Sequence, residues 1–99
     1  MRIYLIVHGF VQGVGYRYLV KRAAQRHNIR GMVRNMPDGS VTILAQAGQR
    51  ELSEFEKEIN VSMKNGPQVA AIERFGESSG SFPKDPGSYD GFVILHSDD

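Results

Sequence analysis

The order of apolar patterns predicts an α+β fold, a two-layer α/β sandwich of the ferredoxin-like β-α-β-β-α-β kind with an antiparallel sheet and an extra C-terminal strand. Three observations lead to it: a glycine loop that joins a strand pattern to a helix pattern, a hairpin signal between two β-prone runs, and a second helix pattern before the last β-prone runs. Each helix must bury its apolar stripe on one sheet face, which gives two layers. With 99 residues the chain is expected to form one domain, residues 1–99.

The first strand and helix are separated by glycines. Residues 3–8 alternate and are rich in β-branched and aromatic side chains, which predicts a central strand. Three glycines in residues 9–15 then interrupt both the two-residue spacing of apolar side chains typical of a strand and the spacing typical of a helix. A helical pattern begins at Tyr16, and Asn28 and Gly31 are expected to close it.

The middle of the chain predicts a hairpin and a second helix. Residues 30–36 and 40–47 are β-prone runs joined by Pro37-Asp38-Gly39, which makes them antiparallel neighbours. A second helix is expected to run up to the stop signal at residues 65–67. Its buried face is expected to consist of Leu52, Phe55, Ile59 and Met63.

The last third of the chain contains two more β-prone runs, residues 69–75 and 92–95. The segment between them is rich in Ser, Gly and Pro over residues 78–89. This composition predicts an exposed, mobile loop.

Composition excludes several classes of protein. The chain has no cysteine, which removes a disulfide framework, a thiolate zinc site and a cysteine nucleophile and favours a cytoplasmic location. No apolar run approaches the roughly 18 residues that span a bilayer, so no membrane association is expected.

The positive charge is concentrated near the N-terminus, where all seven basic residues of the first 37 positions precede the first acidic residue, Asp38. This charge can attract anions, although a solvated helix face explains such a cluster more simply when it is taken alone.

The glycine loop is a candidate anion site. Backbone N–H groups of such a loop, together with the dipole of the following helix, can surround a phosphate. The spacing fits neither a Walker A loop nor a dinucleotide fingerprint, and many glycine loops bind nothing. The residues of this candidate are Gly9, Phe10, Val11, Gln12, Gly13, Val14 and Gly15.

Two polar residues are further candidates. Arg17 falls in the first helical turn, where a cation is unfavourable by up to about 1 kcal/mol. Such a departure from a local rule is typical of a site, and a guanidinium offers a bidentate fork to phosphoryl oxygens. An exposed Arg, or one paired with a carboxylate, is the alternative. Asn35 by itself is explained by turn chemistry before Pro37.

Residues 9–17 (GFVQGVGYR) and 30–41 (RGMVRNMPDGSV) together resemble the acylphosphatase family, and the resemblance extends over nearly the whole chain. It implies that the 9–15 loop cradles phosphate with its backbone amides, that Arg17 binds the phosphoryl oxygens and that Asn35 positions the attacking water. It also implies a small-molecule substrate, an acyl phosphate, hydrolysed to a carboxylate and inorganic phosphate without metal or cofactor. A carboxamide is no base near neutral pH, so Asn35 would orient the water rather than deprotonate it.

Three features depart from the usual family pattern: two residues, Tyr16 and Met32, and the long loop over residues 78–89. Tyr16 stands where Phe is common, and its hydroxyl needs a partner if it is buried. Met32 stands where an aromatic residue is frequent and can fill an irregular gap. Neither position is one of the two proposed catalytic residues.

The remaining candidates are weaker. His8, His27 and His96 lack the spacing of metal ligands, and structural roles are preferred for all three.

A non-catalytic anion or single-stranded RNA binding module is the alternative function. Residues 41–45 offer no ring on which a base could stack, so no nucleic-acid partner is expected. A domain of a larger protein that acts on carbamoyl phosphate fits less well than a free-standing, monomeric enzyme, since the chain ends at Asp99.

Overall fold

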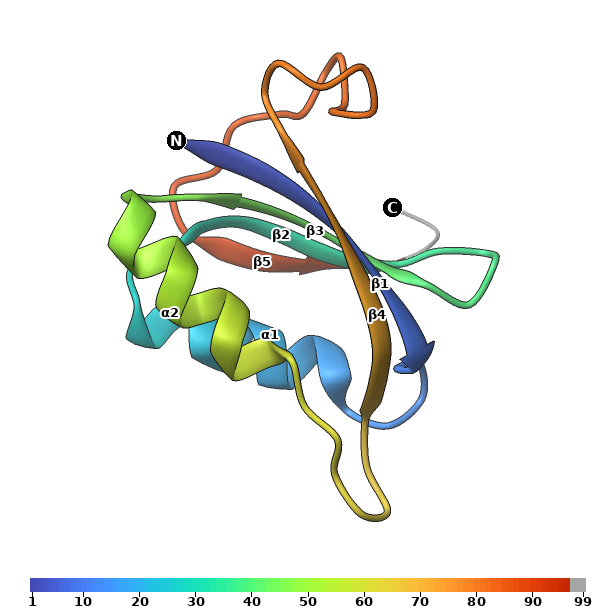
Figure 1. Ribbon diagram of the computed structural model, residues 1–99. Coiled ribbons are helices and arrows are strands. Elements are labelled where there is room, and N and C mark those ends of the chain that lie inside the picture. The colour runs from blue at the N-terminus through green and yellow to red at the C-terminus, as the bar shows by residue number, and fades with distance from the viewer. Residues whose placement is uncertain (97–99) are drawn as a thin grey trace.

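The computed structural model describes residues 1–96 and has two layers, a sheet and a pair of helices (Figure 1). The predicted ferredoxin-like sandwich with an extra C-terminal strand is confirmed. No helix in this described part is both long enough and apolar enough to cross a membrane. The elements in chain order are β1 (Arg2–Phe10), α1 (Tyr16–Arg26), β2 (Arg30–Asn35), β3 (Val41–Gln46), α2 (Gln49–Ile59), β4 (Gln68–Gly76) and β5 (Phe92–Leu95).

The five strands follow the order β4-β1-β3-β2-β5. The first four are antiparallel to their neighbours, as expected, whereas β5 joins the edge parallel to β2. One row of paired positions crosses the whole sheet at the end where β4 stops and β5 starts; it consists of Gly76, Ile3, Ala45, Gly31 and Phe92. Four strand spacings amount to about 19 Å. The long 77–91 connection therefore spans the width of the sheet, which explains both its length and the parallel pairing.

The sheet has a separate apolar cluster on each face. Alternate residues of β1, such as Ile3 and Leu5, are fully buried together with Val20 of α1 and Phe55 of α2 in the main core. The opposite face, which we call the open face, carries a smaller cluster of Met32, Leu44 and Phe82, with Tyr4, Tyr89 and Leu95 packed against it.

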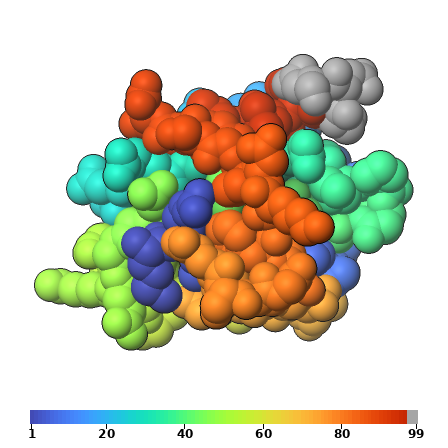
Figure 2. All heavy atoms as spheres, turned by 90° about the horizontal axis from the view of Figure 1, so that it is seen from above, coloured from blue at the N-terminus to red at the C-terminus, as the bar shows by residue number. Residues whose placement is uncertain are grey.

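The 77–91 loop covers part of the open face. Phe82 in the middle of this loop is only 9% exposed and packs on Met32 and Leu44. Figure 2 shows the loop, in orange to red, lying against the dark blue N-terminal residues. The expectation of an exposed loop holds for most of residues 78–89 but not for Phe82, whose side chain buries part of the sheet that the helices leave uncovered.

The second helix is shorter than predicted. It ends at Ile59, and Met63 lies beyond it with 46% of its surface exposed. The chain instead reverses into β4, with Met63 N–H donating to the carbonyl oxygen of Pro67 and a bridge between Ser62 and Gln68. The reversal is needed to bring β4 beside β1, and this tertiary requirement overrides the helical spacing of Met63.

The end of α1 also differs slightly from the prediction. Asn28 has a positive φ of 55° just after the helix, as expected of a residue that closes it. Gly31 is already part of β2 and does not close the helix. Tyr16, fully buried at the start of α1, donates its hydroxyl to the carbonyl oxygen of Ile59 at 2.8 Å, so the partner expected for this hydroxyl is present. Burial raises the pKa of the Tyr16 hydroxyl.

Candidate active site

Three segments meet at one end of the sandwich: the glycine loop, the first turn of α1 and the β2–β3 hairpin (Figure 1). The loop is shorter than predicted, because Gly9 and Phe10 belong to β1. A register shift between His8 and Gly9 marks a bulge there, and a Cβ on Gly9 would lie 2.2 Å from the carbonyl oxygen of Gln68. The loop proper is therefore residues 11–15.

The loop backbone is bent by glycines and leaves its donors free. Gly13 and Gly15 have φ angles of 75° and 79°, the left-handed region that favours glycine. Among the described residues, no acceptor pairs with the backbone N–H groups of residues 12–18, and the first bonded amide is that of Leu19, which donates to the Gly15 carbonyl oxygen. A row of unpaired N–H groups at a helix N-terminus is a ready anion site. The Val11 side chain is 1% exposed and belongs to the core, so Val11 contributes only its backbone to the loop surface.

Arg17 lies in the first turn of α1, as predicted, and is half-buried. Its Nη1 donates to the carbonyl oxygen of Leu95 at 3.5 Å, a long hydrogen bond. No carboxylate in the described part of the chain pairs with it. Of the two alternatives for Arg17, neither a fully exposed side chain nor a carboxylate pair is found, and its charge has no acidic partner there.

Asn35 is the last residue of β2. Val33, two positions earlier, belongs to the core under the helices, so strand alternation turns Asn35 to that same face. Its Oδ1 is enclosed and accepts no hydrogen bond in the structure. A buried acceptor without a donor is costly and requires an explanation, such as a bound water.

Gln12 joins the glycine loop to the hairpin. Its Nε2 donates to the carbonyl oxygens of Met36 at 2.8 Å and Ser40 at 2.9 Å. The sequence placed Gln12 in the loop but did not reveal this side-chain role, because both acceptors lie more than twenty positions away along the chain. The hairpin turn itself is fixed by Asp38, and hydrogen bonds from the Ser40 hydroxyl and backbone N–H hold the pKa of the Asp38 carboxyl below its usual value.

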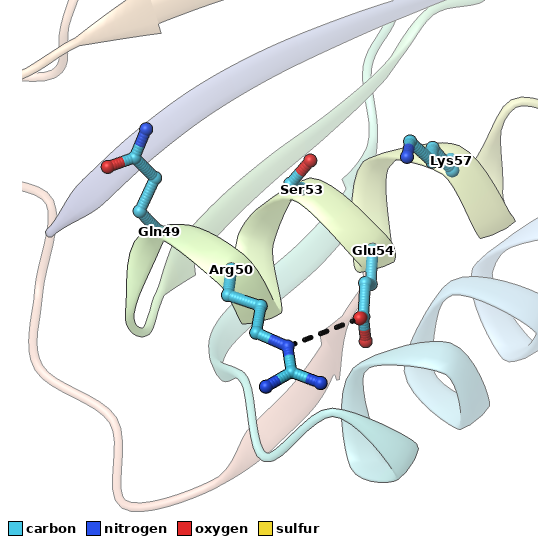
Figure 3. A pocket seen from close by; sticks show the side chains of 5 residues that line it. All are labelled: Gln49, Arg50, Ser53, Glu54 and Lys57. Atoms are coloured by element: carbon cyan, nitrogen blue, oxygen red, sulfur yellow. Dashed lines mark ion pairs between the residues drawn. The ribbon is translucent and has the colours of Figure 1, made fainter.

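A hollow along α2 lacks this convergence of unpaired groups. This shallow hollow of about 570 Å³ follows the outer side of α2, and the side chains that line it point outward from a single helix (Figure 3). Its Arg50 and Glu54 already form an ion pair at 3.5 Å. We therefore place the candidate site at the glycine loop and not in the hollow along α2.

Two of the three histidines, His8 and His27, have carboxylate partners. His8 Nε2 lies 2.6 Å from Glu73 Oε2, and His27 Nε2 lies 2.7 Å from Glu58 Oε1. Hydrogen bonds to Glu58, first from Arg26 and to a lesser degree from His27, lower the pKa of the Glu58 carboxyl. These hydrogen bonds connect the end of α1 to α2. Within residues 1–96 no group of three or more acidic or histidine side chains is placed to hold a metal ion.

The fold and site together define a small α+β sandwich with a row of unpaired backbone N–H donors between its first strand and first helix. Comparison with known proteins identifies the family. The sequence profile of the acylphosphatase family matches residues 3–94. A Thermotoga petrophila acylphosphatase is 35% identical over 90 residues, 91% of either chain. The crystal structure of a Bacillus subtilis acylphosphatase superposes with a TM-score of 0.76 at 31% identity, covering 95% of this chain and 97% of that one.

The chain therefore belongs to the acylphosphatase family, and the family and enzyme class predicted from the two motifs are confirmed. Some alignments are partial. A Leuconostoc mesenteroides acylphosphatase is 55% identical over 49 residues, which are 50% of this chain and 54% of that protein. The chain is also similar to one part of a much longer protein, T. kodakarensis HypF, with a TM-score of 0.74 at 29% identity over 99% of this chain and 12% of that one.

Proposed function

We propose that this protein hydrolyses acyl phosphates to a carboxylate and inorganic phosphate without a metal ion, using the glycine loop, Arg17 and Asn35. The observation that carries the proposal is the set of unsatisfied polar groups at one end of the sandwich. The N–H groups of residues 12–18 and the Arg17 guanidinium are donors that lack an anion, and Asn35 Oδ1 is an acceptor that lacks a donor. A phosphoryl group and a water molecule supply the two missing partners.

The roles follow from the chemistry of phosphoryl transfer. The transition state is loose, so a protein contributes mainly position and charge stabilisation. The loop amides and Arg17 hold the equatorial phosphoryl oxygens, where the transition-state charge resides. Asn35 Oδ1 accepts an O–H of the attacking water and orients its lone pair towards phosphorus.

Bond changes can be completed without a further catalytic group. Water adds to phosphorus, the bond between phosphorus and the acyl oxygen breaks, and the carboxylate leaves with the bonding electrons. The water proton passes to a phosphoryl oxygen. A carboxylate is a stable leaving group, so no general acid is needed, and the charge that a metal would supply is provided by Arg17 and the amides.

We further propose that the protein acts as a monomer in the cytoplasm. The cysteine-free sequence suits a reducing compartment. All the groups of the proposed site come from one copy of the chain: the loop, the first turn of α1 and the end of β2.

An RNA-binding role is less well supported. Readers of RNA with this type of fold present aromatic side chains on the sheet face opposite the helices. Here Phe82 and Tyr89 of the 77–91 loop pack on that face against Leu44 and Met32. Bases would have to displace the loop before they could stack on the sheet.

Replacing Asn35 by Ala is expected to lower kcat for benzoyl phosphate by about 10²-fold, because the water loses its orienting acceptor. The constant for inhibition by inorganic phosphate should stay near its wild-type value, since the loop and Arg17 are untouched. The assay is phosphate release with excess chelator. Asn60→Ala, at the exposed end of α2, is the matched control and should behave as wild type. A wild-type kcat in Asn35→Ala would contradict its proposed role.

Replacing Gln12 by Ala is expected to lower kcat roughly tenfold, because the protein loses the two hydrogen bonds that hold the β2–β3 hairpin, and with it Asn35, beside the glycine loop. Steady-state kinetics with benzoyl phosphate measures the effect. Gln25→Ala, on the exposed face of α1, removes the same side chain away from the site. If both variants reduce kcat equally, Gln12 has no positioning role.

A further inference from the structure

A second pocket lies on the open face of the sheet, beneath the 77–91 loop, with a volume of about 190 Å³. Strand alternation separates it from the phosphate loop, because Arg34 turns to the open face while its neighbour Asn35 turns to the helix face. The pocket is lined by Tyr4, Met32, Arg34, Leu44, Leu95 and four loop residues between Pro83 and Tyr89.

The apolar wall of this pocket is fixed by packing. Met32 and Leu44 are 6% and 2% exposed, and Tyr4, Tyr89 and Leu95 pack against them. The loop that forms the roof is anchored at its start, where Arg2 Nε lies 3.3 Å from Glu77 Oε1 and the Arg2 guanidinium stacks 5.5 Å from the centre of the Phe82 ring. A pocket held open in this way does not need to be ordered by its ligand.

Two opposite charges line the same pocket without neutralising each other. Arg34 on β2 and Asp85 on the loop both contribute to the lining, yet no ion pair joins them. Arg34 has no acidic partner elsewhere among residues 1–96, and its enclosed Nε makes no hydrogen bond. Thr42, directly opposite Arg34 on β3, has a buried hydroxyl that is also unpaired.

We propose that this pocket binds a small apolar α-amino acid in its zwitterionic form. The ligand carboxylate would pair with the Arg34 guanidinium, its ammonium group with Asp85, and its side chain would lie on Met32, Leu44 and Tyr4. A monocarboxylate would satisfy Arg34 but leave Asp85 beside another negative charge, and an amine would leave Arg34 unpaired. The volume limits the ligand to about the size of leucine.

The test is titration of the isotope-labelled protein with L-leucine, followed by NMR shifts of the backbone amides that line the pocket. Saturable shifts are expected below about 10 mM. Isovalerate, which lacks the ammonium group, and isopentylamine, which lacks the carboxylate, should each bind at least about tenfold more weakly. This readout is independent of catalysis, so it stands even if the proposed hydrolysis fails.

Variants locate the binding. Arg34→Gln and Asp85→Asn should each weaken leucine binding about tenfold or more. Arg50→Gln on α2 and Asp90→Asn in the same loop remove the same charges outside the pocket and should leave binding unchanged. The proposal is overturned if leucine gives no saturable shift, if isovalerate binds as tightly as leucine, or if the control variants weaken binding as much as the pocket variants. Asp85 lies in an exposed part of the loop, so its variant can be read even if Arg34→Gln does not fold.

Discussion

Replacing Arg17 by Ala is expected to reduce kcat/KM for an acyl phosphate by about 10³-fold or more. The guanidinium is the only basic group that the structure brings into the first turn of α1 within the described residues, and no carboxylate there competes for it. Its loss removes both the charge and the bidentate fork that, in the proposed mechanism, face the phosphoryl oxygens. Arg17→Lys keeps the charge without the fork and should recover only a small part of the activity.

The measurement is the initial rate of phosphate release from benzoyl phosphate, with circular dichroism as a check on folding. Arg22→Ala is the matched control, because Arg22 is an exposed residue on the same helix. Its kcat/KM should stay within about threefold of wild type, as expected of a surface charge. If a folded Arg17→Ala protein retains wild-type kcat/KM, the phosphate cradle does not depend on Arg17 and the proposed mechanism is wrong.

Replacing Gly31 by Ala is expected to cause the largest loss of stability. Gly31 has a φ of 148°, and a Cβ there would lie 1.8 Å from the carbonyl oxygen of Leu44 on the neighbouring strand. A backbone oxygen in a paired strand cannot move aside as a flexible side chain can. The free energy of unfolding should fall by about 3 kcal/mol or more, which lowers the Tm of a domain of this size by more than about 10 °C.

Thermal unfolding followed by circular dichroism measures this change. Gly80→Ala provides the control, since no atom lies within 4 Å of a Cβ at Gly80 and its φ is not in the left-handed region. Its Tm should differ from wild type by only a few degrees. Equal melting temperatures for Gly31→Ala and Gly80→Ala would show that the β2–β3 contact is looser than the structure describes.

The sequence predicts those parts of the fold that depend on local pattern. Period-two alternation identified β1, and the Pro37-Asp38-Gly39 signal identified the hairpin that pairs β2 with β3. Met63 was assigned to α2 because it continues the spacing of Ile59, but the chain must reverse there to pair β4 with β1. Local spacing carries no information about that requirement.

Long-range contacts account for the other differences. The composition of residues 78–89 indicates a loop but not that Phe82 packs on Met32, fifty positions earlier in the chain. β5 pairs parallel to β2 because the 77–91 connection crosses the whole width of the sheet, and no local sequence pattern predicts that crossing.

In the candidate site too, local patterns predict some residues, whereas contacts between distant parts of the chain determine others. Arg17 departs from a rule of helix electrostatics, whereas Asn35 is indicated only by the family resemblance that the two motifs carry together, because turn chemistry alone explains an Asn at this position. The Gln12 link to the hairpin and the Leu95 carbonyl that accepts from Arg17 depend on residues far apart in sequence. Neither could be predicted before the strands were placed side by side.

Hydrolysis of benzoyl phosphate by the wild-type protein in ¹⁸O-labelled water, with excess chelator, tests the central claim most directly. Attack of an Asn35-oriented water on a phosphoryl group held by the loop and Arg17 predicts catalysed turnover with the ¹⁸O label in inorganic phosphate and none in benzoate. Label in benzoate would place the attack at the acyl carbon, and turnover that occurs without chelator but stops when chelator is added would show that a metal is required. Either of these two results would contradict the mechanism proposed for this site.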